Sequence, residues 1–161
     1  MKRDETTNAM RMLERAGAVF TPFAYEAATA LSGMEIAAKL GMDPSTVFKT
    51  LVTVGASKKH YVFVVPAEKE LDLKKAASAA GEKSVSMIKQ AELLPLTGYV
   101  HGGCSPVGMK KQFTTVIDVS ARELDAVIVS AGKIGRQIMI APGELAKACP
   151  FSYAAICRDP A

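Results

Sequence analysis

The chain has 161 residues, of which 49% are hydrophobic and 22% charged, a size and composition typical of one globular domain. Its formal net charge of +4 suits contact with phosphates, although many proteins of this charge bind no nucleic acid. No apolar run approaches the roughly 18 residues that span a bilayer, and no apolar signal segment follows the charged start at residues 1–5. We therefore expect one domain over residues 1–161 that lies in the cytoplasm and makes no membrane contact.

Cysteine and histidine usage argues against a metal or disulfide framework. The three cysteines, Cys104, Cys149 and Cys157, are odd in number and lack a CxxC spacing. Neither His60 nor His101 stands in a metal-binding spacing. The chain also contains no GxxxxGK[ST], GxGxxG or GxSxG sequence. We expect no metal and no cofactor.

In the first half of the chain, the pattern predicts a helix at 7–16, a strand at 19–25, a helix at 32–40 and strands at 47–54 and 61–65. Pro22 would place the first strand at a sheet edge because proline cannot donate to a neighbouring strand. Ser32 and Glu35 have the spacing of a capping box, which starts a helix. Gly41 should end that helix. The strands at 47–54 and 61–65 are expected to pair across a polar connection.

In the second half, the pattern predicts helices at 72–80 and 88–94, strands at 114–119, 126–130 and 137–140, a helix at 142–148 and a strand at 153–156. Residues 132–135 have the composition of a turn between two of these strands. Strands outnumber helices and lack a regular βαβ rhythm. The sequence therefore predicts an α+β domain with a mixed or mostly antiparallel sheet that can curl into a barrel.

A glycine-rich loop at residues 102–108 is the most informative segment. Its glycines let the backbone approach a ligand closely, and Pro106 fixes the turn. Exposed N–H groups of such a loop can hold a carbonyl oxygen or the oxyanion formed from it. A tight connection without a ligand is the alternative from spacing alone. A dyad of Cys104 and His101 is a further alternative, which a separation of three residues does not support.

Two further positions are candidate site residues. Lys49 lies in an otherwise apolar strand, where its ammonium group can point across a cleft to an anionic group. A solvent-facing position on a half-exposed strand is the alternative for this lysine. The segment 130–135 follows an apolar strand, and its small residues suit a pocket wall, although the pattern alone favours a plain hairpin.

These segments resemble the YbaK/EbsC family of the prolyl-tRNA-synthetase editing-domain superfamily. The similarity extends over almost the whole chain and includes residues 20–25, 38–41, 47–51, 71–75, 96–99, 102–108 and 115–118. Each motif is weak alone, but their order and spacing are specific. The resemblance implies a single α+β domain in which helices surround a curved mixed sheet or barrel. It also implies hydrolysis of a misacylated tRNA ester, most specifically that of Cys-tRNA(Pro), in trans beside prolyl-tRNA synthetase.

The resemblance also implies roles for individual residues. Lys49 matches the characteristic strand lysine of the family and is the expected catalytic residue. The residues expected to bind the aminoacylated 3′ end of tRNA are Tyr25, Thr50, Gly102, Gly103, Pro106, Ser130 and Gly132. Ser32 stands where an aromatic residue is frequent, and Gln137 stands where some relatives carry an acid. These two departures affect the shape of the pocket and hence its amino-acid selectivity.

The family chemistry needs no nucleophile from the enzyme, because the resemblance implies that the thiol of the bound cysteine attacks its own ester carbonyl. Three alternatives remain at this stage. The substrate can be Cys-tRNA(Cys) or another misacylated tRNA such as Ala-tRNA(Pro). The chain can also be a non-catalytic module that binds aminoacyl-tRNA or a synthetase. Lys49 and the intact loop with Pro106 favour an enzyme.

Overall fold

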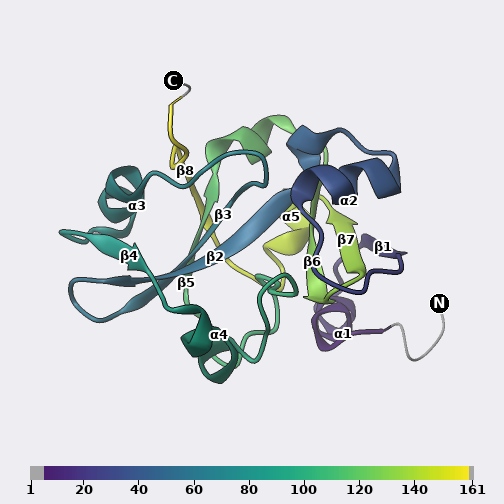
Figure 1. Ribbon diagram of the computed structural model, residues 1–161, viewed down its shortest axis with the longest axis horizontal. Coiled ribbons are helices and arrows are strands. Elements are labelled where there is room, and N and C mark those ends of the chain that lie inside the picture. Colours follow the sequence, from purple (N-terminus) through teal and green to yellow (C-terminus); the bar gives the residue numbers. More distant parts are fainter. Residues whose placement is uncertain (1–5, 160–161) are drawn as a thin grey trace.

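The computed structural model describes residues 6–159, which form an α+β domain (Figure 1). The helices are α1 (Asn8–Arg15), α2 (Gly33–Leu40), α3 (Leu73–Ala80), α4 (Gln90–Thr97) and α5 (Pro142–Leu145), with 3-10 turns η2 (Pro44–Thr46) and η3 (Val119–Glu123). The strands are β1 (Phe20–Ala24), β2 (Phe48–Gly55), β3 (His60–Pro66), β4 (Val85–Met87), β5 (Thr114–Asp118), β6 (Val127–Lys133), β7 (Arg136–Ile140) and β8 (Ser152–Ala154).

The strands form two sheets. One is antiparallel with the order β1-β7-β6, and the other is mixed with the order β4-β2-β3-β5-β8. In the mixed sheet β2 runs antiparallel to β3 and β4, whereas β3, β5 and β8 run parallel. A parallel bridge between Val47 and Ile128 joins the two sheets. The predicted α+β class is confirmed, and Pro22 lies on the edge strand β1 as expected.

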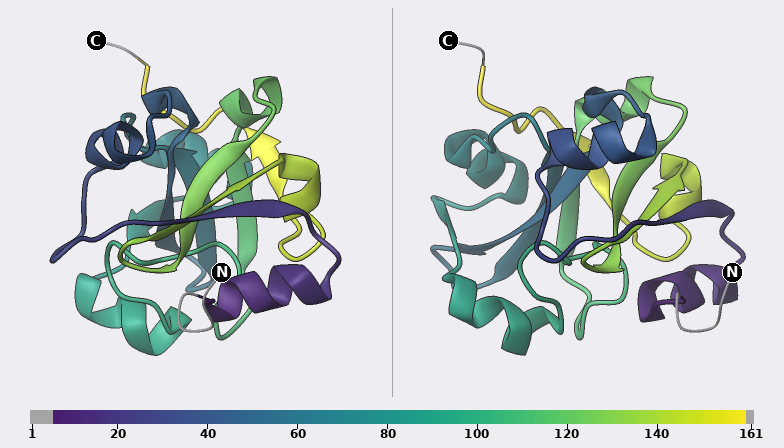
Figure 2. Two further views of the ribbon diagram at one scale, coloured as in Figure 1. Left: turned by 90° about the vertical axis from the view of Figure 1, so that its right-hand side faces the viewer. Right: turned by 45° about the vertical axis from the view of Figure 1, so that its right-hand side comes forward.

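The main core lies between the two sheets. Alternate residues of β2, including Phe48 and Val52, face the buried residues of β6 and β7 and the apolar side of α1. The opposite face of β2 and β3 packs against α3, where Phe63 and Ala76 are fully buried. Figures 1 and 2 show α3 and α1 at opposite ends of the domain with the sheets between them. The mixed sheet therefore carries apolar contacts on both faces.

Local sequence signals place several helix ends. The capping box at Ser32 is complete, because its Oγ accepts from the Glu35 N–H at 3.2 Å and its own N–H donates to Glu35 Oε1 at 3.0 Å. Gly41 and Gly81 end α2 and α3 in the left-handed conformation, with φ of 67° and 72°. These helix ends agree with the sequence predictions.

Some boundaries differ from those that the sequence predicts. The short strand β4 was not predicted, and α4 begins at Gln90 rather than at Ile88. Helix α4 also continues past Pro95 to Thr97, whose hydroxyl donates to Leu93 O at 2.7 Å. Strand β6 extends to Lys133, α5 is shorter than predicted, and β8 lies slightly earlier. These elements are set by contacts with distant strands rather than by local periodicity.

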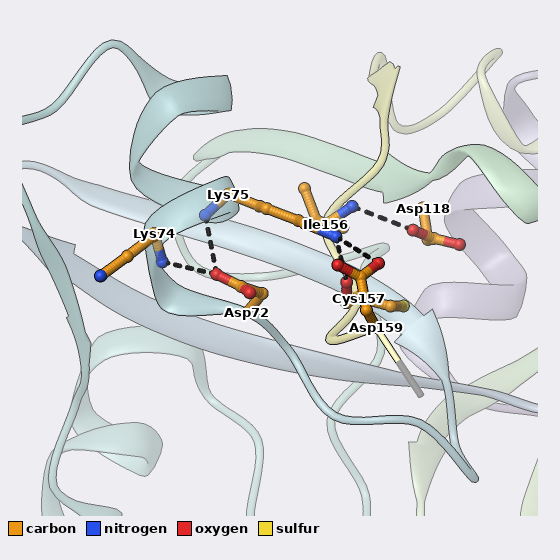
Figure 3. A network of polar contacts seen from close by, with 7 residues as sticks. All are labelled: Asp72, Lys74, Lys75, Asp118, Ile156, Cys157 and Asp159. Carbon is orange, nitrogen blue, oxygen red and sulfur yellow. Dashed lines mark hydrogen bonds and ion pairs between the residues drawn. The ribbon is translucent and has the colours of Figure 1, made fainter. Parts of the chain in front are cut away.

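A polar network anchors the end of the described chain to α3 and β5 (Figure 3). Asp72 caps α3 by accepting from the backbone N–H of Lys75 at 3.0 Å, and the Lys75 ammonium donates to Cys157 O at 3.0 Å. The Asp118 carboxylate at the end of β5 accepts from Ile156 N at 3.1 Å. These contacts hold the segment after β8 against both elements.

Two kinds of feature are absent from residues 6–159. None of the helices in this range has the length and hydropathy needed to cross a membrane. The same residues contain no group of three or more His, Cys, Asp and Glu side chains placed to hold a metal ion.

Candidate active site

A cavity of about 440 Å³ opens between the two sheets, beside the glycine loop. Its walls come from the β1–α2 connection, β2, α4, the glycine loop, β6 and β7. The lining residues are Ala30, Leu31, Ser32, Gly33, Ile36, Val47, Phe48, Lys49, Thr50, Leu51, Ala67, Leu93, His101, Gly102, Cys104, Ser130 and Gln137. The three predicted segments, around Lys49, Gly102 and Ser130, therefore share one cavity.

The edge of β2 forms one wall. Five consecutive residues, 47–51, line the cavity, although the side chains of a strand alternate between its two faces. On the side of β2 away from β3, β4 pairs only with 53–55 and Val47 bridges to Ile128. No described strand pairs with 48–51 on that side, so the cavity meets β2 at its edge and reaches side chains of both faces.

Lys49 is half-buried on this edge, opposite Val65 of β3. None of the ion pairs among the described residues includes Lys49, so its ammonium group is available to an anion. The positive charge of Lys49 also affects the pKa of Cys157, which lies on the α3 side of the sheet. Burial and Asp118 raise the pKa of Cys157 to about 12, whereas the positive charges of Lys69 and Lys49 oppose that rise.

The glycine loop lines the same cavity as the strand edge. Gly102 has a φ of 84°, and a Cβ at this position would lie 2.3 Å from the Cβ of Ala30. Both the backbone conformation and the close contact therefore require glycine. Figure 2 shows the β1–α2 connection, which carries Ala30, passing the β6–β7 turn on its way to α2.

Only some of the loop amides are free to bind a ligand. The Gly103 N–H donates to Val100 O at 3.0 Å, the Val107 N–H donates to Ser105 Oγ at 3.2 Å, and Pro106 has no N–H. No partner is recorded for the N–H of Gly102 or Cys104 among the described residues, and both residues line the cavity. These two amides are the candidate donors to a substrate oxygen.

Tyr99 holds the glycine loop in place. Its hydroxyl donates to Val107 O, and burial raises its pKa to about 12, which keeps the donor protonated. The Tyr99 ring also lies against Gly132, where a Cβ would come within 2.9 Å of a ring carbon. The loop is therefore fixed against β6 before any substrate binds, an arrangement that favours preorganised donors.

A bulge in β6 forms the third wall. The register of β6 and β7 shifts between Ser130 and Lys133, and bulges of this kind re-aim side chains next to active sites. Ser130 lines the cavity, and its Oγ accepts from the Gly132 N–H at 3.1 Å. This segment therefore forms the predicted hairpin, and its Ser130 also contributes to the cavity wall.

Besides Tyr25, three residues predicted to bind substrate lie outside the cavity wall. Gly103 packs against the backbone of Lys133, Gly132 packs against Tyr99, and Pro106 is buried within the loop. In the structure they shape the loop and the bulge. Direct contact between any of them and the substrate stays a prediction.

Tyr25 reaches the cavity through Gln137. Gln137 lines the cavity, and its Nε2 donates to the Tyr25 hydroxyl oxygen at 3.2 Å. Burial raises the pKa of Tyr25, and its hydrogen bonds with Gln137 and Gly135 partly offset that rise. Tyr25 itself is not a lining residue, so its predicted substrate contact is not visible as a wall of the cavity.

Thr50 and Ser32 both line the cavity. The Thr50 Oγ1 is buried and has no hydrogen-bond partner among the described residues. A buried hydroxyl without a partner is costly, and direct contact between this group and the substrate stays a prediction. Ser32 combines its capping role in α2 with a place on the cavity wall.

The structure disfavours a dyad of Cys104 and His101. Both residues line the cavity, but burial raises the pKa of the Cys104 thiol to about 12. The thiolate is the nucleophilic form, and such a thiol remains protonated near neutral pH. Sequence reasoning did not identify Ala30, Leu31 or Leu93 as lining residues, because only the folding of distant segments brings them to the cavity.

The chain is similar to known aminoacyl-tRNA editing proteins. A family described as the aminoacyl-tRNA editing domain matches residues 27–148. An Enterococcus faecalis protein, EbsC, provisionally assigned as a Cys-tRNA(Pro)/Cys-tRNA(Cys) deacylase, is 46% identical over 142 residues, which cover 88% of this chain and 87% of that protein. A proline–tRNA ligase of Pelobacter propionicus is 25% identical over 99 residues, which cover 62% of this chain and 17% of the ligase.

Solved structures are also similar. A structure provisionally assigned as a trans-editing enzyme for prolyl-tRNA synthetase is 25% identical with a TM-score of 0.83, over 95% of this chain and 99% of that one. A hypothetical protein that is 24% identical also gives a TM-score of 0.83, over 92% of this chain and 97% of its own, and supports the fold alone.

Proposed function

The chain belongs to the aminoacyl-tRNA editing domain family, and we propose that it removes cysteine from Cys-tRNA(Pro), with Cys-tRNA(Cys) as a second substrate. It is an aminoacyl-tRNA deacylase, an enzyme that cleaves the ester between an amino acid and the 3′ end of a misacylated tRNA. The similarity to EbsC over most of both chains supports cysteine as the amino acid.

The observation that carries this proposal is the shared cavity of Lys49 and the glycine loop. Its volume of about 440 Å³ lies within the usual range of small-molecule sites, roughly 300–1,000 Å³. An ammonium group on one wall suits a phosphate or the ester end of the terminal adenosine. Free amides on the opposite wall suit the ester carbonyl.

We assign the chemistry to the substrate and its positioning to the protein. The sulfur of the bound cysteine forms a bond to its own carbonyl carbon, and the bond from that carbon to the adenosine oxygen breaks. The thiol proton passes to the departing oxygen, which leaves as a hydroxyl group, and water then hydrolyses the resulting cyclic thioester to free cysteine. The amides of Gly102 and Cys104 stabilise the negative charge on the carbonyl oxygen, while Lys49 holds the nucleotide end.

This division of roles agrees with the groups that line the cavity. Cys104 is a protonated thiol with a pKa of about 12, and Ser130 Oγ already accepts a hydrogen bond from Gly132. Neither group is an activated nucleophile. A substrate that brings its own thiol supplies what these residues do not.

The proposed partner is prolyl-tRNA synthetase, in a transient complex in the cytoplasm, where tRNA is charged. The matched proline–tRNA ligase contains a segment similar to this chain within a much longer protein. A free-standing domain that acts on the same product requires the tRNA to be handed over in trans. The synthetase would then contribute the tRNA discrimination that a small domain lacks.

The proposal is tested by deacylation of purified Cys-tRNA(Pro), with and without prolyl-tRNA synthetase. Cysteine should be released faster than in the absence of the protein, and Ser-tRNA(Pro) and Ala-tRNA(Pro) should be poor substrates because neither carries a thiol. Equal turnover of alanyl and cysteinyl esters would indicate an activated water instead. No release of cysteine under either condition would reject the proposed function.

A further inference from the structure

Gln137 is a polar side chain on the cavity wall that the proposed chemistry does not use. It is only 3% exposed, and it lines the cavity. In the antiparallel pair of β6 and β7, Gln137 lies directly opposite Ser130, which lines the same cavity. Cross-strand neighbours share a face of the sheet, so this wall belongs to the three-stranded sheet and stands across from Lys49 on β2.

The hydrogen bonds of the Gln137 amide leave one group unused. Its Nε2 donates to the Tyr25 hydroxyl oxygen at 3.2 Å. Among the described residues, no partner is recorded for its Oε1. The Gln137 Oε1 is not among the fully buried unpaired atoms of the described residues, so this acceptor is open on the cavity wall and can take a donor from the ligand.

The charges around the cavity identify that donor. None of the described residues that line the cavity is an aspartate or a glutamate. Lys49 and His101 are both lining residues. An aminoacyl ester always carries an α-amino group, whose N–H bonds need an acceptor and which Lys49 repels when both are charged. The free amide oxygen on the opposite sheet is a neutral acceptor suited to this group.

We propose that Gln137 Oε1 accepts a hydrogen bond from the α-amino group of the aminoacyl ester, and that Tyr25 acts as a positioning residue by holding the amide in this orientation. This inference rests on the proposed deacylase function. It assigns the two ends of the substrate to the two sheets. The amino group binds the β6–β7 wall, and the nucleotide end lies towards Lys49.

The proposed contact of Gln137 with the α-amino group is tested by comparing the wild-type protein and one variant on two substrates. Wild-type protein and Gln137→Leu are each assayed in single turnover with cysteinyl-tRNA and with 3-mercaptopropionyl-tRNA, which keeps the thiol and lacks the amino group. The substitution should reduce the cysteinyl rate about tenfold, the size expected for one lost hydrogen bond to a charged group. It should change the mercaptopropionyl rate less than about twofold, since no hydrogen bond is lost there.

Two variants separate recognition from packing. Gln137→Glu keeps an acceptor and should retain the preference for the amino group, whereas Gln137→Leu should lose it. Tyr25→Phe keeps the ring but releases the amide, and it should reduce only the cysteinyl rate. Equal losses on both substrates in Gln137→Leu would overturn the inference and leave the deacylase function intact. Failure of the wild-type protein on every aminoacyl-tRNA would instead reject the function itself.

Discussion

Two cavities in the described part of the domain have the same size, and of these two only the first suits a nucleic acid. The first, with Lys49, His101 and the glycine loop, and the second, between η2 and η3, each measure about 440 Å³. The second is lined by Met42, Asp43, Thr46, Glu123, Leu124, Asp125, Ala126, Ile128 and Met139. The bridge between Val47 and Ile128 separates them, because Val47 lines the first cavity and Ile128 lines the second.

Charge, rather than volume, distinguishes the proposed site from the second cavity. Three carboxylates, those of Asp43, Glu123 and Asp125, line the second cavity, and they repel a polyanion such as tRNA. The first cavity has no lining carboxylate among the described residues and is lined by Lys49. Four changes test this contrast, from the largest expected effect to the smallest.

Lys49→Ala should reduce deacylation of Cys-tRNA(Pro) by at least about 100-fold, the usual cost of losing one preorganised electrostatic contact. The measurement is the single-turnover rate of a variant whose circular dichroism matches that of the wild-type protein. Lys69→Ala is the matched control, because it removes an equal charge outside the cavity lining. Full activity of folded Lys49→Ala would remove this residue from the mechanism.

Gly102→Ala should lower the activity about tenfold or more and destabilise the fold by about 1–3 kcal/mol, because φ is positive there and the methyl group meets Ala30. Thermal unfolding and the deacylation rate measure the two effects. Gly143→Ala is the control, since nothing lies within 4 Å of a Cβ at that position. Adding Ala30→Gly to Gly102→Ala should restore part of the activity by removing the contact.

Cys104→Ala should retain most of the wild-type rate, because the thiol is protonated at working pH, with a pKa of about 12, and contributes its backbone amide rather than its sulfur. The rate and the thermal midpoint are measured together, so that lost packing is separated from lost chemistry. A loss as large as that of Lys49→Ala would restore the cysteine dyad as a mechanism.

The double variant Glu123→Gln/Asp125→Asn should change the rate by less than about twofold, because surface substitutions away from the chemistry are nearly neutral. The variant removes two carboxylates from the second cavity and leaves the first cavity unaltered. A large change in deacylation at low salt would show that the acidic cavity takes part in binding tRNA.

The elements that sequence reasoning placed well depend on short-range interactions. The capping box of Ser32 and Glu35 and the stop at Gly41 involve residues within one helix, so their spacing suffices to predict them. The helix predicted at 88–94 ended too early, because α4 continues past Pro95 to Thr97, where the Gly98 N–H bonds to Leu94 O and completes the last turn.

The cavity itself was predicted only in part. Lys49, Gly102 and Ser130 were each identified as single candidate residues. They line one cavity because the edge of β2 is unpaired between its contact with β4 and the bridge at Val47. The contact of Gly102 with Ala30 joins segments 72 residues apart. The role of Gln137 depends on its register with β6. Such pairings follow from tertiary packing, which local propensity does not encode.

The last strand has a consequence for biosynthesis. β8 pairs in parallel with β5, and Ile156 then bonds to both Asp72 and Asp118. The apolar face between α3 and the sheet therefore stays partly exposed until the segment that follows β8, up to residue 157, has left the ribosomal tunnel. A nascent chain would expose this apolar surface during elongation, so a premature stop codon near position 150 should give an aggregating product.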